Sequence, residues 1–174
     1  MPIAIYPATF DPITNGHVDI AERAARLFDK LVVGVYNRPM KNLLFNTEDR
    51  LSMTRMALAH LDNVEVATYS GLTVNFAIEQ EAGYIVRGLR ALSDFEWELQ
   101  LSLANHSLDT SIETICLMAS QEHSFLSSSI LKEIALNNGS IEHLAPPAVV
   151  TALRKKARFD ENGDSPIRTV SVRD

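Results

Sequence analysis

The feature that most constrains this chain is a repeated alternation of short β-branched runs with helix-like patterns. The run at residues 31–36 is almost wholly apolar, which is typical of a parallel strand buried on both faces. Similar short runs recur along the chain, and the five predicted strands are residues 3–6, 31–36, 64–68, 84–86 and 114–118. Strands that alternate with helices predict an α/β fold, a doubly wound domain built on a five-stranded parallel sheet.

Helical patterns follow these strands and then close the chain. The predicted helices are residues 16–28, 47–61, 73–81, 93–108, 127–138 and 147–157. Ser93 and Glu96 form a predicted capping box at the start of the fourth helix. Gly139 is the predicted left-handed terminator of the fifth. One domain over residues 1–157 is expected, with a polar C-terminal tail over residues 158–174 that is either frayed or docked as a short strand on a neighbouring subunit.

Composition narrows the class of protein. A chain of 174 residues is the length of one domain, and its net charge of −6 excludes a broadly basic protein that coats nucleic acid. The single cysteine, Cys116, falls in a predicted buried strand and can form no intrachain disulfide. We therefore expect a reducing, cytoplasmic location. The acidic net charge argues against a nucleic-acid partner, and no membrane partner is expected because no apolar run approaches the roughly 18 residues needed to span a bilayer.

Chemistry in such a fold is expected in the loops that follow the strands. The loop after the first strand holds Thr9 and then Gly16 and His17 at the start of a helix. A helix N-terminus suits an anion, Gly16 lets a nucleotide approach the backbone, and His17 offers a ring N–H. The alternative is a simple turn, because Asp-Pro and Asn-Gly are common turn dipeptides.

Cations follow two other strands. Arg38 and Lys41 come after the second strand, and Arg87 and Arg90 after the fourth. Isolated surface cations are usually only solvated, but two such pairs at strand ends in an acidic protein favour a ligand with several phosphates.

A run of serines follows the fifth strand. Ser127, Ser128 and Ser129 stand at the start of a helix, where capping needs only one of them. Three hydroxyls beside free amides suit a triphosphate. Glu98 falls on the fourth helix, where an exposed glutamate is the ordinary interpretation. The sequence contains no GxxxxGK[ST] or GxGxxG phosphate motif, no GxSxG elbow and no zinc-like spacing, so no metal ligand is predicted.

Four segments together carry a specific resemblance. They are Tyr-Pro-Ala-Thr-Phe-Asp-Pro-Ile-Thr-Asn-Gly-His at residues 6–17, Arg-Gly-Leu-Arg at 87–90, Asp-Phe-Glu-Trp-Glu-Leu-Gln at 94–100, and Ser-Phe-Leu-Ser-Ser-Ser-Ile-Leu-Lys-Glu at 124–133. In this order they resemble the bacterial phosphopantetheine adenylyltransferases of the nucleotidylyltransferase superfamily, over residues 3 to about 157. The departures are Ala8 in place of the usual Gly, Trp97 in place of Tyr, and His123 where Trp or Tyr is frequent.

The resemblance implies a Rossmann-like fold and the transfer of the adenylyl group of ATP to 4′-phosphopantetheine. The products would be dephospho-CoA and pyrophosphate, in coenzyme A biosynthesis. It also implies Mg²⁺ carried with the ATP phosphates, a homohexamer, and coenzyme A as a feedback inhibitor.

Site residues are carried over position by position. The resemblance implies that His17 and Lys41 are catalytic and that Thr9, Lys41, Thr73 and Arg87 bind phosphopantetheine. The implied ATP-binding residues are Thr9, Phe10, His17, Gly88, Leu89, Arg90, Glu98, His123, Ser124, Phe125, Leu126, Ser127, Ser128 and Ser129.

Other functions stay open at this point. A nicotinate mononucleotide adenylyltransferase would share the G-x-x-H motif, but it would typically carry Arg at the position of Lys132 and lack the Arg87–Arg90 segment. A transfer-RNA synthetase fragment would need a KMSKS-like loop. A non-catalytic nucleotide sensor would not need His17, and a structural scaffold would not need the cations.

Overall fold

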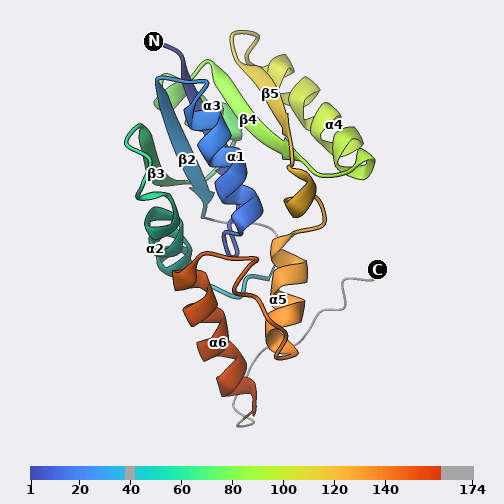
Figure 1. Ribbon diagram of the computed structural model, residues 1–174. Helices are drawn as coiled ribbons and strands as arrows, with labels where there is room; N and C mark the ends of the chain where they lie inside the picture. The colour runs from blue at the N-terminus through green and yellow to red at the C-terminus, as the bar shows by residue number, and fades with distance from the viewer. Residues whose placement is uncertain (38–41, 162–174) are drawn as a thin grey trace.

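The computed structural model describes residues 1–37 and 42–161 of the chain. Within them, five strands form one fully parallel sheet in the order β3-β2-β1-β4-β5 (Figure 1). The strands are β1 (Ile3–Ala8), β2 (Lys30–Tyr36), β3 (Val64–Tyr69), β4 (Tyr84–Leu89) and β5 (Glu113–Met118). The predicted doubly wound α/β fold with a five-stranded parallel sheet is confirmed.

Helices cover both faces of this sheet. They are α1 (Asn15–Ala25), α2 (Thr47–Leu58), α3 (Thr73–Glu79), α4 (Leu92–Leu108), α5 (Ser128–Leu136) and α6 (Pro147–Glu161), with a 3₁₀ turn at Gln121–His123. One apolar core joins the sheet to α1, α2, α5 and α6, and a smaller one joins it to α3. Figure 1 shows α5 and α6 beyond the carboxyl ends of the strands. Among the described helices, none is long and apolar enough to cross a membrane.

The sheet opens between β1 and β4. These strands are paired only at Ala4–Tyr84 and Ile5–Ile85, whereas β1 is paired with β2 along its whole length. Pro7 has no N–H with which to extend the ladder toward β4, and its carbonyl accepts from the Arg87 side chain instead. The chain therefore diverges at the switch point of the strand order, where α/β folds bind ligands.

Two predicted boundaries are wrong by a few residues. Strand β4 continues through Leu89, so Arg87 lies in the strand and not in the loop after it. Helix α6 continues to Glu161, so the first residues assigned to the tail are helical. Residues 162–174, and with them the proposed roles of the tail, lie outside the described residues.

The predicted capping box at the start of α4 is also wrong. The N-cap is Ala91, which makes no side-chain cap hydrogen bond. The helix is capped two residues earlier than predicted, by an alanine, which has no side-chain oxygen to accept a hydrogen bond. Asp94 in the first turn accepts from the backbone and side chain of Arg90.

Two further expectations are corrected. At the end of α5, Asn138 and not Gly139 has the left-handed conformation, with φ of 57°. A Cβ at position 139 would lie 2.5 Å from the Ile134 side chain, so glycine is needed there for close approach. Cys116 is exposed and not buried, because β5 is an edge strand of the single chain.

Gly34 in β2 gives a test of the packing on the α3 face. A Cβ there would lie 2.5 Å from the Phe76 ring and 3.1 Å from the Tyr69 ring, which stack on each other. Because such overpacking costs about 1–3 kcal/mol, we expect Gly34→Ala to lower the free energy of unfolding by that amount in urea denaturation. Gly83→Ala is the matched control, since no atom lies within 4 Å of its added Cβ. Equal effects at the two positions would contradict this account.

Candidate active site

The loop from β1 to α1 fixes His17 by capping the helix. Thr14 is the N-cap, and its hydroxyl accepts from the His17 amide. In return, Nδ1 of His17 accepts from the Thr14 amide at 3.1 Å. Because Nδ1 is an acceptor, the hydrogen of the neutral ring is on Nε2. The predicted ring N–H donor is therefore Nε2–H. The ring itself is held in place by the N-terminal cap of α1.

Phe10 supports this arrangement from inside the loop. Its ring packs edge-to-face against His17 at a centroid distance of 5.2 Å and against Tyr6 at 5.5 Å. Phe10 is buried rather than open to solvent. The structure thus gives it the role of a support beneath His17, while its predicted contact with ATP stays a prediction.

At the open edge of β4, Arg87 is held by Glu98 of α4. Nε and Nη2 of Arg87 donate to the two carboxylate oxygens at 2.7 and 2.6 Å, and Nη1 donates to the Pro7 carbonyl at 2.6 Å. Three of the five guanidinium hydrogens are used, which leaves two for a ligand. Burial lowers the pKa of Arg87, but the hydrogen bond and charge of Glu98 outweigh burial and raise it. The guanidinium is a fixed positive charge.

Glu98 was expected as an exposed helical glutamate from its position alone, and that interpretation is wrong, because the residue is 7% exposed. Its carboxylate is aimed at Arg87 and not at open solvent. A role in ATP binding came from the family resemblance. The geometry places Glu98 as the residue that orients Arg87.

Two aromatic residues lie within electrostatic reach of Arg87. Burial raises the pKa of Tyr6, while the charges of Arg87 and Arg90 act in the opposite direction. Burial likewise raises the pKa of Tyr69, whose hydroxyl lies 3.3 Å from the hydroxyl of Thr73. Thr73, a predicted substrate ligand, therefore starts α3 on the same side of the molecule as Arg87.

Arg90 connects β4 with the segment that follows β5. Its Nε and Nη2 pair with Asp94, and its Nη1 donates to the carbonyl of Leu126 at 3.3 Å. Leu126 is buried, and it precedes the serine run. The predicted phosphate-binding arginine thus lies against the predicted phosphate-binding helix.

The three serines have different surroundings. Ser127 is the N-cap of α5, and its hydroxyl accepts from the Ile130 amide. The Ser128 hydroxyl donates to the carbonyl of Pro12 at 2.8 Å, and Ser129 is exposed. The first-turn amides of Ser128 and Ser129 have no intrahelical acceptor, as at any helix N-terminus. An anion at this helix would therefore be bound more by backbone amides than by a row of hydroxyls.

The predicted residues of three loops meet at one edge of the sheet. A Cβ at Gly16 would lie 3.4 Å from the side chain of His123, so the segment after β5 lies directly against the start of α1. In that segment His123 is half-buried, while Ser124 and Phe125 are exposed. Gly88 and Leu89 end β4. Arg38 and Lys41 lie outside the described residues, so the catalytic role of Lys41 stays a prediction.

The structural roles of three charged residues, Asp11, Lys132 and Arg50, were missed from the sequence. Asp11 was read as part of a turn, yet it is almost fully buried and paired with Lys132 at 2.8 Å. Among the residues whose burial is described, Arg50 is the largest fully buried side chain. The sequence pattern could have indicated this burial, because Arg50 lies on the same helical face as Met53, Thr54 and Leu58 of α2.

Among residues 1–37 and 42–161, no group of three or more His, Cys, Asp or Glu side chains is arranged to hold a metal ion.

Comparisons with known proteins identify the family of this chain. Residues 5–134 match the cytidylyltransferase-like family model. The chain is 51% identical to the phosphopantetheine adenylyltransferase of Herpetosiphon aurantiacus over 161 residues, 92% of this chain and 98% of that protein. It is 53% identical to the protein of the same name from Gloeobacter violaceus over 154 residues, 88% of this chain and 96% of that protein.

A solved structure supports the fold. The nicotinic acid mononucleotide adenylyltransferase of Plasmodium falciparum, complexed with NaAD, superposes with a TM-score of 0.69 at 17% identity, over 91% of this chain and 97% of that one. At that identity the likeness shows the fold alone. The sequence relatives decide the family: the chain belongs to the cytidylyltransferase-like family and, within it, to the phosphopantetheine adenylyltransferases.

Proposed function

We propose that this protein transfers the adenylyl group of ATP to 4′-phosphopantetheine, which gives dephospho-CoA and pyrophosphate. The observation that carries the proposal is the Arg87 guanidinium, held by Glu98 and Pro7 at the opening between β1 and β4. A fixed cation with two hydrogens to spare suits a phosphomonoester. Relatives that match nearly the whole chain carry the name of this activity.

The chemistry needs charge neutralisation more than proton removal. A phosphomonoester has a second pKa near about 6, so at pH 7 it is largely dianionic and already nucleophilic. Its attack on the ATP α-phosphorus brings two anions together. The protein therefore has to hold them in line and stabilise the charge that develops, which positioned cations and N–H donors can do.

Each part of the site has a place in this reaction. Arg87 and Thr73 hold phosphopantetheine, with Lys41 also on its phosphate. Nε2–H of His17 donates to the α-phosphate oxygens as charge builds there. Arg90 and the α5 N-terminus hold the β- and γ-phosphates, which leave as pyrophosphate. Mg²⁺ bound to the ATP phosphates would supply further positive charge there.

Pyrophosphate release is the direct test. The protein is mixed with ATP and Mg²⁺ and given either 4′-phosphopantetheine or nicotinate mononucleotide. Release with phosphopantetheine alone supports the proposal. Release with the mononucleotide alone would assign another substrate to the same fold, and ATP binding without release from either substrate would favour a nucleotide sensor.

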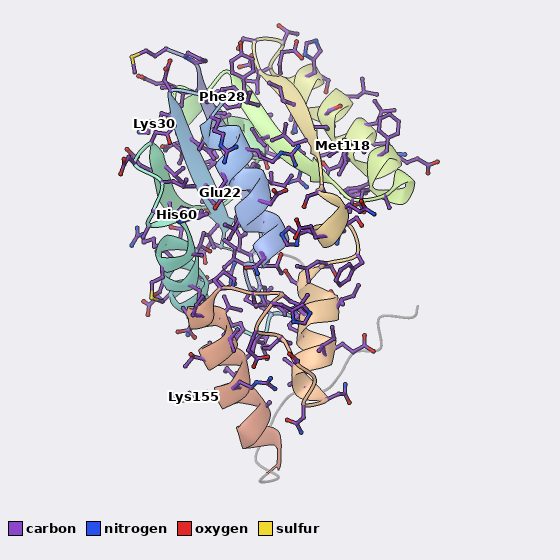
Figure 2. The ribbon with its side chains drawn as sticks, in the orientation of Figure 1. Glu22, Phe28, Lys30, His60, Met118 and Lys155 are labelled. Carbon is purple, nitrogen blue, oxygen red and sulfur yellow. The ribbon has the colours of Figure 1, made fainter. Side chains whose placement is uncertain are left out.

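Helix α4 is the basis for proposing that several copies of the chain assemble. In the single chain its burial pattern is the reverse of the usual one. Among its described side chains the buried ones include Glu98 and Asn105, whereas large apolar ones face outward. The exposed apolar residues of α4 are Phe95, Trp97, Leu99, Leu103 and Leu108. Met118 adds to them from the edge strand β5 beside α4 (Figure 2). An apolar surface this large is expected to be covered, and the family resemblance makes further copies of this chain its occupant, in a homohexamer.

A charge on this face should break the assembly. We expect the wild type to sediment with the mass of six chains and Leu103→Glu to sediment as smaller species, because a carboxylate would be buried without a partner. Leu27→Glu is the matched control, since Leu27 in the turn after α1 is 58% exposed and Leu103 is 61% exposed. A wild-type monomer, or a Leu103→Glu hexamer, would contradict the proposed interface.

Regulation and location follow the same proposal. Coenzyme A contains the phosphopantetheine group, so it is proposed to occupy the active site as a feedback inhibitor. A cytoplasmic location is proposed because the chain has a single cysteine, which fits a reducing compartment. Competition of coenzyme A with phosphopantetheine in the pyrophosphate assay tests the first point.

A further inference from the structure

The β1–α1 loop holds a strained residue at its centre. Phe10 has φ of 48°, in the left-handed region that a bulky side chain rarely adopts. Such a conformation costs about 1–3 kcal/mol and persists only where the surroundings impose it. Since Phe10 packs against His17, its conformation also decides where the imidazole is held. The residues that anchor the loop on either side of Phe10 therefore matter for the reaction.

On one side of Phe10, the anchor is Arg50 of α2. Its Nη1 donates to the Thr9 carbonyl at 2.6 Å and to the Tyr36 carbonyl at 2.8 Å. Its Nε donates to the Phe45 carbonyl at 3.3 Å. Burial lowers the pKa of Arg50 and the charge of Asp11 raises it. Backbone carbonyls thus surround a fully buried cation, and one of them is that of Thr9.

On the other side, the anchor is the carboxylate of Asp11, which is 3% exposed. It accepts from the amides of Leu44 and Phe45 at 3.0 and 2.9 Å, in the segment before α2. Its Oδ2 also accepts from Nζ of Lys132 in α5 at 2.8 Å. One carboxylate thereby joins three segments that are far apart in the sequence.

Helix α5 has a second attachment to the same loop. The Ser128 hydroxyl donates to the carbonyl of Pro12, the residue after Asp11. Ser128 and Lys132 are four residues apart and lie on one face of the helix. The two bonds therefore fix both the position and the rotation of α5 relative to the loop that carries Thr9 and Phe10.

Building on the proposed function, we propose that Asp11 and Lys132 are positioning residues, which hold the Thr9–Phe10 segment in register with the N-terminus of α5. The first of these elements supports His17 at the α-phosphate, and the second faces the β- and γ-phosphates. The Lys132 ammonium acts through Asp11 and not as a phosphate ligand. Without it, the two halves of the triphosphate site can shift relative to each other.

Lys132→Met tests the proposal, because it removes the ammonium and keeps the length of the side chain. Misplacement of reacting groups by about 1 Å can cost a factor of about 100 in rate. We therefore expect kcat, normalised to the folded fraction from circular dichroism, to fall between about 10-fold and 100-fold. The KM for ATP should change less than about 5-fold. Lys132→Arg, which keeps the charge, should restore kcat to within about 5-fold of the wild type.

Lys30→Met is the matched control. Lys30 pairs with Glu65 at 2.9 Å, but both side chains are solvent-accessible. Figure 2 shows Lys30 at the end of the sheet opposite to α5. The kcat of Lys30→Met should equal that of the wild type. A folded Lys132→Met protein with kcat within about 3-fold of the wild type would overturn the proposal, as would an equal loss in Lys30→Met.

A second variant covers the case in which Lys132→Met does not fold. Asp11→Asn combined with Lys132→Met removes both charges, so that no buried carboxylate is left unpaired. This double variant should fold and still lose at least about 10-fold in kcat. Wild-type kcat in the double variant would overturn the positioning role.

Hydrogen exchange separates this proposal from the proposed function. The amides of Leu44 and Phe45 donate to Asp11, and we expect them to exchange at least about 10-fold faster in Lys132→Met than in the wild type. This measurement needs no substrate. A wild-type protein that releases no pyrophosphate would refute the proposed function alone, whereas unchanged exchange at both amides would refute the role of Lys132.

Discussion

Replacement of His17 by alanine is expected to lower kcat by about 10²–10³-fold and to leave the affinity for ATP nearly unchanged. One donor aimed at developing charge contributes about 3–4 kcal/mol to the transition state and little to the ground state. The acceptor role of Nδ1 toward the Thr14 amide places the ring hydrogen on Nε2, so Nε2–H is the donor that this role requires. Steady-state kinetics, together with calorimetric titration of ATP, measures both quantities.

The same substitution also removes part of a helix cap, worth about 1 kcal/mol of stability. His17→Gln controls for that loss, because glutamine at the third helical position is a common capping-box acceptor. We expect His17→Gln to unfold at nearly the wild-type urea midpoint and still to be about 10²-fold slower. Recovery of kcat in His17→Gln would mean that His17 acts through the cap, and a proportional loss of ATP affinity in His17→Ala would mean that it binds the ground state.

Replacement of Glu98 by alanine is expected to produce the largest loss of stability. It would leave the Arg87 guanidinium half-buried with only the Pro7 carbonyl as its partner. Removal of one member of a buried ion pair costs about 3–5 kcal/mol, because the remaining charge is uncompensated. Urea denaturation at one fixed protein concentration measures this loss. The KM for phosphopantetheine should rise more than the KM for ATP, since Glu98 orients Arg87.

Glu65→Ala is the matched control for this prediction. It breaks an exposed pair with Lys30 of similar length, and such pairs contribute about 0–1 kcal/mol. Replacing both Arg87 by Met and Glu98 by Leu should recover much of the stability but none of the activity. Equal losses in Glu98→Ala and Glu65→Ala would show that burial adds nothing to the Arg87–Glu98 pair. If the KM for ATP rose more than the KM for phosphopantetheine, Glu98 would instead contribute to ATP binding.

Much of the site could be predicted because its motifs are local. Thr9, Gly16 and His17 fall within one short segment, and the serine run starts a helix by ordinary capping rules. Glu98 could not be found in this way, since a glutamate on a helix is usually exposed. Only its place beside Arg87, eleven residues earlier in the chain, explains its burial. The same holds for Cys116, whose exposure follows from the edge position of β5.

The sequence alone determined the alternation of strands and helices, and through its motifs the family, because both depend on patterns within a few residues of each other. The tertiary structure decided the order of the strands, the separation of β1 from β4 beyond Pro7 and the exposure of apolar side chains on α4. It also decided the partners of the buried charges: Asp11 and Lys132 are 121 positions apart and meet only after the sheet has formed. A buried charge is stable only beside a partner of opposite charge, and the residue type alone does not specify where that partner lies.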